Sequence, residues 1–298
     1  MTQTLTVPNQ LESTSFEELG LPPDVLQTLA KLDFHTPTDI QRAMIPPALR
    51  GEDCLGQART GTGKTAAFAL TMLQRIDPKA GLQALVLTPT RELALQVHEH
   101  VRMLGAARPL KTVTAYGGTR VSTNLRRLQE NPKIVIGTPG RILDLMQRKA
   151  LDLSRIRIVV LDEVDRMLDI GFRDDIRRIL RQVKSEHQTL FVSATIDADI
   201  RKLARTFMND PVEINVSSDR LTVEGIEQNF VSIQPRDKYK TLRKFLEHEK
   251  PKLAIVFTNT KAAARRIAER LKRDGVECKE IHGDLVQRRR ERVMQSFR

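Results

Sequence analysis

The chain has 298 residues, which is longer than one ordinary domain and suits two, each able to bury its own core. Its 49 Lys and Arg against 37 Asp and Glu give a net charge of +12, which favours a polyanionic partner such as nucleic acid or an acidic membrane face, although solubility alone would also account for it. No apolar stretch approaches the ~20 residues of a membrane span, and the first residues resemble no export signal. The two cysteines, Cys54 and Cys278, lie far apart in the sequence. We therefore exclude a membrane-spanning protein and a disulfide-rich exported protein, and expect a cytoplasmic one.

Short apolar runs alternate with longer helical patterns through residues 16–214, after an N-terminal extension of residues 1–15. Four of the runs are apolar along nearly their whole length, which predicts strands buried on both faces, as in a parallel sheet. They are ALVLT at 84–88, KIVIG at 133–137, IVVL at 158–161 and TLFVS at 189–193. The alternation predicts an α/β fold with a doubly wound parallel sheet.

The segment ARTGTGKTAAF, which begins at Ala58, has the residue types of a phosphate-binding loop. Glycines at 61 and 63 would let backbone N–H groups close on phosphate oxygens. Lys64 would supply a positive charge, and Thr65 would offer a hydroxyl to Mg²⁺. A helical pattern follows the loop, but the run EDCLGQA before it is a poor strand by its pattern. The strict form of the motif has Gly where this chain has Ala58.

Three acids, Asp162, Glu163 and Asp165, follow the apolar run IVVL at its carboxyl end. A loop that binds Mg²⁺ and ATP needs one carboxylate on a neighbouring strand to hold the water shell of the metal, and a second to orient or deprotonate the attacking water. Asp162 fits the first role and Glu163 the second. A solvated turn at the end of a strand is the plainer interpretation, but Lys64 and Thr65 in the same chain disfavour it.

The stretch 215–225 is polar and rich in turn residues, which predicts a linker. Residues 226–298 then carry three strand-like runs, NFVSI, LAIVFTN and VECKEIHG, and two helical patterns, YKTLRKFLEH and KAAARRIAERLKRDG. These residues hold 19 basic and 10 acidic side chains, which is most of the excess charge of the chain. Their number is below the ~100 of an ordinary domain, so we expect a partial second domain.

Taken together, these motifs resemble those of the DEAD-box ATP-dependent RNA helicases, with DEVD where the family usually has DEAD. The loop of the family has the form A-x-x-G-x-G-K-T, which residues 58–65 satisfy. The resemblance covers nearly all of residues 16–298. It implies a RecA-like ATP-binding domain at 16–214 and an incomplete second RecA-like domain at 226–298, with ATP and Mg²⁺ as cofactors. RNA is the implied partner, held through its backbone with little sequence selectivity.

The resemblance also implies roles for individual residues. Catalysis would involve Lys64, Asp162 and Glu163, and Thr65 and Asp162 would hold Mg²⁺ through water. The nucleotide would be bound by Phe34, Gln41, Ala58, Arg59, Thr60, Gly61, Thr62, Gly63, Lys64 and Thr65. The RNA would be bound by Pro89, Thr90, Arg91, Gly117, Gly118, Thr138, Gly140 and Arg141.

Two of these assignments rest on particular segments. In FHTPTDIQ, from Phe34 to Gln41, the family resemblance implies that Gln41 hydrogen-bonds the adenine edge and Phe34 stacks on its face. The family usually has Gly where this chain has Asp33, and Thr36 or Thr38 would also serve as a plain helix cap. The second segment, SAT, resembles the coupling segment of the family. It implies that Ser193 and Thr195 bond Asp165 and so connect nucleotide state with RNA binding.

The end of the chain leaves alternatives open. The run from His282 fits either a further family motif or a basic amphipathic helix with Val293, Met294 and Phe297 facing inward. Two later family motifs are absent, one of which supplies arginines to the γ-phosphate, so we expect a C-terminally truncated helicase with slow turnover. The alternative is an ATP- and RNA-binding protein without effective unwinding. A DNA translocase and a P-loop kinase or transferase are weaker alternatives.

Overall fold

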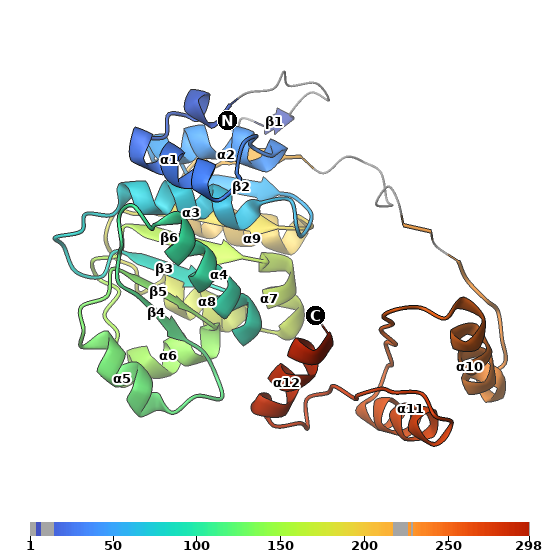
Figure 1. The fold of residues 1–298 in the computed structure, drawn as a ribbon. Coiled ribbons are helices and arrows are strands. Elements are labelled where there is room, and N and C mark those ends of the chain that lie inside the picture. Colours follow the sequence, from blue (N-terminus) through green and yellow to red (C-terminus); the bar gives the residue numbers. More distant parts are fainter. Residues whose placement is uncertain (1–3, 7–14, 217–225, 228, 298) are drawn as a thin grey trace. The chain divides into compact units, whose positions relative to one another are not determined.

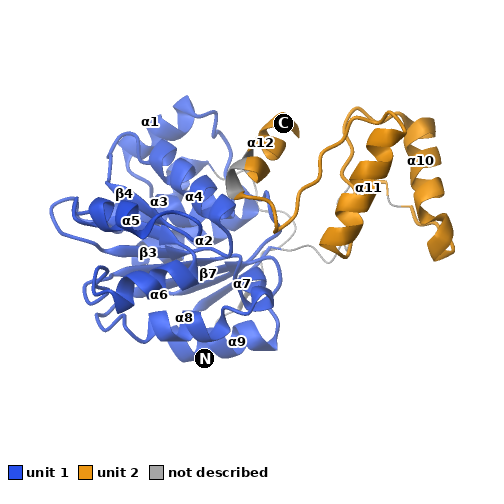
Figure 2. Cartoon of the chain, turned by 90° about the horizontal axis from the view of Figure 1, so that it is seen from below, with its two compact units in different colours: residues 1–220 blue, residues 221–298 orange. Residues whose placement is uncertain are grey.

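The computed structural model describes residues 4–6, 15–216, 226–227 and 229–297 (Figure 1). The chain divides into two compact units, Met1–Arg220 and Leu221–Arg298 (Figure 2). Most of the predicted N-terminal extension, and the predicted linker from residue 217 onward, lie outside the described residues.

Unit 1 is built around one sheet, which has eight strands among the described residues, in the order β1-β8-β2-β7-β6-β3-β5-β4. Every pairing in it is parallel. The strands are β1 Thr4–Thr6, β2 Cys54–Gln57, β3 Ala84–Leu87, β4 Thr112–Ala115, β5 Ile134–Gly137, β6 Ile158–Asp162, β7 Gln188–Ser193 and β8 Val212–Asn215. The predicted α/β fold with a parallel sheet is confirmed, and the four apolar runs form β3, β5, β6 and β7.

Helices cover both faces of this sheet (Figure 1). They are α1 Pro23–Lys31, α2 Asp39–Arg50, α3 Lys64–Arg75, α4 Arg91–Leu104, α5 Val121–Leu128, α6 Pro139–Gln147, α7 Val164–Ile170, α8 Arg173–Leu180 and α9 Ala198–Phe207, with a 3₁₀ helix η1 at Phe16–Leu19. Alternate residues of a strand point to opposite faces. In β3, Ala84 and Val86 join one core with α1 to α4, whereas Leu85 and Leu87 join a second core with α6 to α9. Burial on both faces explains why these strands are apolar along their length.

Strand β2 corrects one expectation, because the run before the phosphate loop was a poor strand by pattern. Its residues pair with β7 on one side and β8 on the other, in the interior of the sheet. Pairing on both sides stabilises a strand whose side chains alone predict little. Gly56 lies under α2, where an added Cβ would be 3.3 Å from the Ile40 side chain. The small residue that weakens the strand pattern thus permits close helix packing.

Unit 2 contains helices α10 Lys238–Glu249, α11 Lys261–Arg273 and α12 Gln287–Phe297, and a short 3₁₀ helix η2 at Pro235–Asp237. The two predicted helical patterns form α10 and α11. The prediction of three strands is wrong here, since no strand occurs in the described part of 226–297. Apolar side chains of these runs stay in solvent, with Phe230 94% and Phe257 91% exposed. A strand needs a hydrogen-bonded neighbour, which the side-chain pattern alone does not supply.

The last predicted pattern forms α12, but Met294 is exposed rather than inward-facing. None of the helices in the described residues is both long enough and apolar enough to cross a membrane.

Candidate functional site

The predicted site residues of unit 1 gather at one edge of the sheet. Because all strands are parallel, their carboxyl ends lie at the same edge, where ligands of open α/β sheets commonly bind. The phosphate loop, the acidic motif and the SAT segment follow β2, β6 and β7, which are neighbours in the order β2-β7-β6. The predicted RNA-binding segments follow β3, β5 and β4, the next three strands. The sheet order therefore separates the predicted nucleotide-binding segments from the predicted RNA-binding segments, which we call the nucleotide half and the RNA half.

The predicted phosphate loop is a tight turn between β2 and α3. Gly61 and Gly63 have φ angles of +83° and +90°, which favour glycine. A Cβ on Gly63 would lie 2.4 Å from Gln41 Nε2, so a side chain there would displace Gln41 from its contact with the loop. Within the loop, the Thr62 hydroxyl donates to the Arg59 carbonyl at 2.7 Å. The turn ends at the N-terminus of α3, where backbone N–H groups and the helix dipole favour an anion.

Lys64 is the first residue of α3 and is only 5% exposed. Its Nζ donates to the Ala58 carbonyl across the loop at 2.8 Å. The Ala58 N–H in turn donates to the Ser193 carbonyl at 3.0 Å, which ties the loop to the end of β7. A buried ammonium bonded to a neutral carbonyl gains from a nearby anion, so this loop fits a phosphate group. Thr60, on the same loop, is exposed.

Gln41 joins the loop to the start of α2 and is buried. Its Oε1 accepts from the N–H of Thr38, the N-cap residue, at 2.9 Å, and its Nε2 donates to the Gly63 carbonyl at 3.2 Å. Phe34 is half-buried against the core beneath α1 and α2. Asp33, which stands where the family usually has Gly, has a φ of +59°. It therefore occupies the left-handed conformation that favours glycine but that Asp tolerates better than most residues.

The acidic motif follows β6, where Asp162 closes the strand and is 2% exposed. Burial raises the pKa of Asp162 to about 7. The positive charge of the Lys64 ammonium lowers the pKa of Asp162, against the effect of burial. The two side chains are therefore close enough to share one electrostatic environment. Glu163, the N-cap residue of α7, has a φ of +54°, a strained conformation for a residue with a side chain. Arg166 Nη1 lies 3.6 Å from Glu163 Oε2.

Asp165 connects the acidic motif to the SAT segment. Its Oδ2 accepts from the Thr195 N–H at 3.0 Å and from the Thr195 hydroxyl at 3.1 Å. Its own N–H donates to the Ser193 hydroxyl at 3.2 Å. Partial burial acts to raise the pKa of Asp165, but the hydrogen bonds to its carboxylate, including one from the Arg166 N–H, outweigh burial and hold the pKa below its ordinary value. The carboxylate is therefore ionised at neutral pH, as these bonds require.

The donor set near the loop fits Mg²⁺ held through water and phosphate rather than a closed protein cage. Asp162 supplies one buried carboxylate, and Thr65 supplies a hydroxyl from the first turn of α3. Mg²⁺ keeps several waters and commonly takes one or two carboxylates together with phosphate oxygens. No group of three His, Cys, Asp or Glu side chains that could hold a metal occurs in the part of the chain that the structure describes.

In the RNA half, the segment after β3 begins α4. Thr90 is the N-cap residue, and its hydroxyl accepts from the Leu93 N–H at 3.2 Å. The Arg91 guanidinium lies over the Tyr116 ring, 4.7 Å from its centroid, as a cation–π contact. A Cβ on Gly118 would lie 4.0 Å from Arg91 Nη1. Arg91 thus adjoins the two-glycine turn that follows β4, and Pro89 before it is buried.

The segment after β5 begins α6, with Thr138 as its N-cap residue. The Thr138 N–H donates to the Ala115 carbonyl at 3.0 Å, at the end of β4. Gly140 is exposed and faces open space. The side chain of Arg141 is instead turned inward and bonds Thr119 and Asn124. The structure thus brings three of the predicted RNA-binding segments to one edge but leaves Arg141 mostly out of solvent.

Two residues that contact the predicted site were not singled out from the sequence. Tyr116 stacks on Arg91, and it directly precedes the two glycines, which was its only signal. Asn124 bonds Arg141 and lies on the same face of α5 as Val121, Leu125 and Leu128. A single polar residue on an otherwise apolar helix face is a signal that the sequence did contain.

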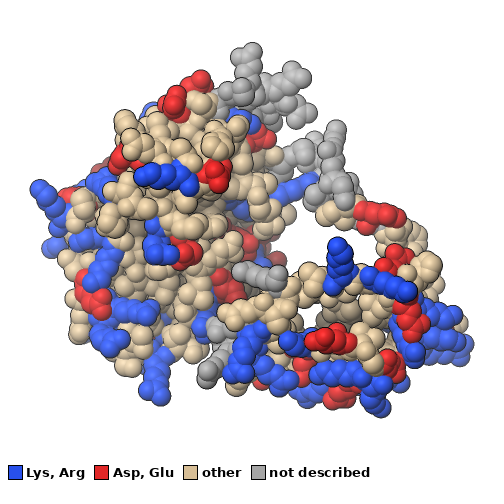
Figure 3. Space-filling model, viewed as in Figure 1, with Lys and Arg blue, Asp and Glu red and all other residues tan. Residues whose placement is uncertain are grey.

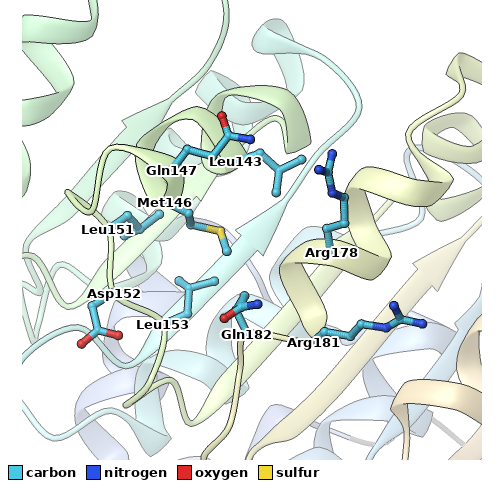
Figure 4. Close-up of a pocket in the computed structure, with 9 residues that line it drawn as sticks. All are labelled: Leu143, Met146, Gln147, Leu151, Asp152, Leu153, Arg178, Arg181 and Gln182. Atoms are coloured by element: carbon cyan, nitrogen blue, oxygen red, sulfur yellow. The ribbon is translucent and has the colours of Figure 1, made fainter.

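A pocket of about 480 Å³ lies elsewhere, between α6 and α8 (Figure 4). It is lined by Leu143, Met146, Gln147, Leu151, Asp152, Leu153, Arg178, Arg181 and Gln182. None of the predicted site residues lines it, so this pocket is separate from the site at the strand ends.

Comparison with known proteins agrees with this arrangement. Residues 38–203 match the DEAD/DEAH box helicase family, and residues 237–298 match the helicase conserved C-terminal domain. The DEAD-box ATP-dependent RNA helicase CshA of Bacillus subtilis is 41% identical over 285 residues, which are 95% of this chain and 58% of that protein. The ATP-dependent RNA helicase CshA of Listeria monocytogenes is 42% identical over 286 residues, 96% of this chain and 55% of that protein.

Solved structures give the same result. S. cerevisiae Dbp5 bound to RNA and ADP BeF3 matches with a TM-score of 0.85 and 34% identity, over 95% of this chain and 73% of that chain. A DEAD box protein from the hyperthermophile Methanococcus jannaschii matches with a TM-score of 0.68 and 36% identity, over 96% of this chain and 78% of that one. The chain spans little more than half the length of the curated relatives it matches.

Proposed function

Because this chain belongs to the DEAD/DEAH box helicase family, we propose that it carries ATP- and RNA-binding machinery of an ATP-dependent RNA helicase. The family expected from the motifs, and the RecA-like fold that goes with it, are confirmed. One observation carries the proposal. Buried Lys64 and buried Asp162 share one electrostatic environment at the ends of β2 and β6, beside three strand ends that carry the predicted RNA-binding loops.

In the nucleotide half, the loop at 58–65 would hold the phosphates of ATP through its N–H groups. Lys64 would exchange its bond to the Ala58 carbonyl for a bond to phosphate, a stronger charge-assisted interaction. Asp162 and Thr65 would hold Mg²⁺, which when bound neutralises phosphate charge. Glu163 would orient the attacking water and accept its proton.

Gln41 would recognise the adenine edge through the second lone pair of its Oε1 and the second N–H of its Nε2, since each of these atoms has one partner at present. Phe34 would provide the face on which the base stacks. Gln41 contacts both the N-cap residue of α2 and the phosphate loop. Binding or release of the adenine would therefore affect the phosphate loop through this one side chain.

In the RNA half, the exposed loop backbones of Gly117, Gly118 and Gly140, with the side chains of Thr90 and Arg91, would contact phosphates and 2′-hydroxyls. Such contacts fix the position of the strand without reading base edges. The bonds of Asp165 to Ser193 and Thr195 would link this binding to the nucleotide, because they join the acidic motif to the strand that also holds the phosphate loop.

The first test measures the affinity of a fluorescent ATP analogue with Mg²⁺ for the wild-type chain, Lys64→Ala and Lys79→Ala. Lys79 is exposed and lies outside the loop, so it serves as the matched control. We expect Lys64→Ala to weaken binding roughly tenfold or more, the size of a lost hydrogen bond to a charged group, and Lys79→Ala to change it less than twofold. Equal affinities for wild type and Lys64→Ala would refute the proposed phosphate site.

The second test measures binding of a labelled single-stranded RNA with and without a non-hydrolysable ATP analogue and Mg²⁺. We expect the chain to bind RNA, and to bind it more tightly when the nucleotide is present. The factor by which the nucleotide raises the affinity for RNA should equal the factor by which RNA raises the affinity for the nucleotide. Absence of RNA binding under both conditions would refute the proposed partner.

A further inference from the structure

The turn after β4 and the turn that begins α6, both predicted to contact RNA, are joined through one arginine that is mostly out of solvent. Arg141 Nη1 donates to the Asn124 Oδ1 at 2.5 Å and to the Thr119 hydroxyl at 3.2 Å. Arg141 Nη2 donates to the Thr119 carbonyl at 2.8 Å. The Arg141 side chain is 10% exposed, and its Nε lies 3.8 Å from Asp144 Oδ2. Most of its hydrogen-bonding capacity is therefore used within the protein.

Asn124 completes this connection from the other side. It is buried at 2% exposure, and its Nδ2 donates to the Thr114 carbonyl in β4 at 2.9 Å. Both ends of its amide are thus bonded, one to the sheet and one to Arg141. A buried amide is costly unless it is satisfied in this way, so an apolar residue would be the simpler choice for packing α5 alone.

The turn that Arg141 holds has groups suited to a phosphate backbone. Within the described part of the chain, the N–H groups of Gly117 and Gly118 donate to no acceptor. An added Cβ on Gly117 or on Gly140 would meet no atom within 4 Å, so both glycines face open space that a ligand backbone can approach. Free donors in a loop bind phosphate well only if the loop is held in one conformation.

We propose that Asn124 and Arg141 form a clamp that holds the turn at 117–119 against the start of α6, so that both turns present their backbones to RNA in one arrangement. Asn124 is a positioning residue that acts through Arg141, and Arg141 serves RNA binding through its bonds to Thr119 and Asn124 rather than through its charge. The inference rests on the RNA binding proposed above and adds to it the residues that organise the RNA half.

A double-mutant cycle on RNA affinity tests the clamp, using a labelled single-stranded RNA and the variants Asn124→Leu, Arg141→Ala and the combination of the two. Ser122→Ala, an exposed position on the same helix, is the control. We expect each single variant to weaken RNA binding roughly 5- to 10-fold, and the double variant to be no weaker than Arg141→Ala, because each removes the same connection. Additive losses would overturn the proposal, since Asn124 would then act without Arg141. Ser122→Ala and all three variants should keep the affinity for the ATP analogue within twofold.

Arg141→Lys separates the clamp from a direct charge contact. Lysine retains the charge but cannot span the carbonyl, the hydroxyl and the amide at once. We expect Arg141→Lys to bind RNA as weakly as Arg141→Ala, and recovery of wild-type affinity by Arg141→Lys would overturn the clamp.

Hydrogen exchange of the Thr123 and Thr138 amides, which donate to the Arg120 and Ala115 carbonyls beside the two turns, measured without RNA, tests the clamp independently of the proposed function. We expect faster exchange in Asn124→Leu and Arg141→Ala, to a similar extent, and no change in Ser122→Ala. Unchanged exchange in both variants would overturn the clamp even if RNA binding were lost. Failure of the wild-type chain to bind RNA would refute the proposed partner, while the exchange experiment would still decide whether the clamp exists.

Discussion

The carboxyl group of Asp162 lies at the buried end of β6, where the absence of water disfavours its ionised form. Because its pKa of about 7 lies above its ordinary value of 3.8, the folded protein binds this proton more tightly than the unfolded chain does. The free energy of unfolding contributed by this group is therefore greatest below pH 4 and falls as the pH rises to about 7. This loss of stability accompanies a buried carboxylate that stays available for the proposed Mg²⁺.

Replacing Asp162 by Asn should therefore stabilise the ligand-free protein more at high pH than at low pH. We expect the gain in the free energy of unfolding to be larger at pH 8 than at pH 5 by on the order of 2 to 3 kcal/mol. Urea unfolding without nucleotide or Mg²⁺ measures it, with the exposed Asp169→Asn in α7 as the control. A gain that is the same at both pH values would contradict the electrostatic account.

Single residues show what a sequence motif can and cannot predict. The motifs named the types and order of the residues at the strand ends, and the structure brings those of each half together. The motifs did not predict which residues within the protein these side chains would hydrogen-bond. Gln41 serves as both helix cap and loop contact, and Arg141 bonds to Asn124, which no motif contains. Partners of this kind depend on which strands are neighbours, and that information is spread over the whole unit.

Among the elements, the sequence predicted correctly the strands that are apolar because both of their faces are buried. It failed for segments in which the presence or absence of a neighbouring strand determines whether a strand forms. Strand β2 was underestimated because Gly56 and Gln57 weaken its pattern, yet it pairs on both sides. The runs around Phe230 and Phe257 were overestimated because their apolar side chains have no neighbouring strand in the described residues. Periodicity reports on the side chains of a strand, whereas its stability comes equally from the backbone of its neighbours.

The packing of β4 against β5 supplies a test at this scale. A Cβ on Gly137, the last residue of β5, would lie 2.2 Å from the Ala115 carbonyl oxygen and 2.9 Å from the Ile142 side chain. We expect Gly137→Ala to lower the free energy of unfolding by about 1 to 3 kcal/mol or more, since the backbone must shift. The loss should also weaken RNA binding, because both turns of the RNA half begin at these two strand ends.

Gly81→Ala is the matched control, since a Cβ there would lie 3.6 Å from its nearest neighbour, an ordinary contact. Urea midpoints of the two variants give the comparison. Equal urea midpoints would show that β4 and β5 can move apart with no loss of stability. That result would contradict the close approach of Gly137 to Ala115.

Across the whole molecule, charge is distributed unevenly along the chain. Lys and Arg outnumber Asp and Glu by 19 to 10 in residues 226–298, and basic side chains are prominent over α10 and α11 (Figure 3). Many of them are exposed, where their interactions with a polyanion are long-ranged and screened by salt. Such charges strengthen binding to any nucleic acid and carry no sequence information.

Binding of single-stranded RNA by the chain should therefore be strongly salt-dependent and nearly independent of sequence. We expect the logarithm of the affinity to fall linearly with the logarithm of the salt concentration, and Arg91→Ala to reduce the slope by about 0.7, the loss of one phosphate contact. Oligonucleotides of equal length and different sequence should bind within a few-fold of one another. A preference of more than tenfold for one sequence would instead indicate contacts to base edges.

The position of β2 between β7 and β8 also has a consequence for how the protein is made. Strand β2 ends at Gln57, but its neighbours end at Ser193 and Asn215. At roughly 5 to 20 residues per second, a ribosome completes β8 about 8 to 30 s after it has made the phosphate loop. The nascent loop spends that interval without the strands that flank β2, and the proposed nucleotide site can form only after the last of these strands has been synthesised.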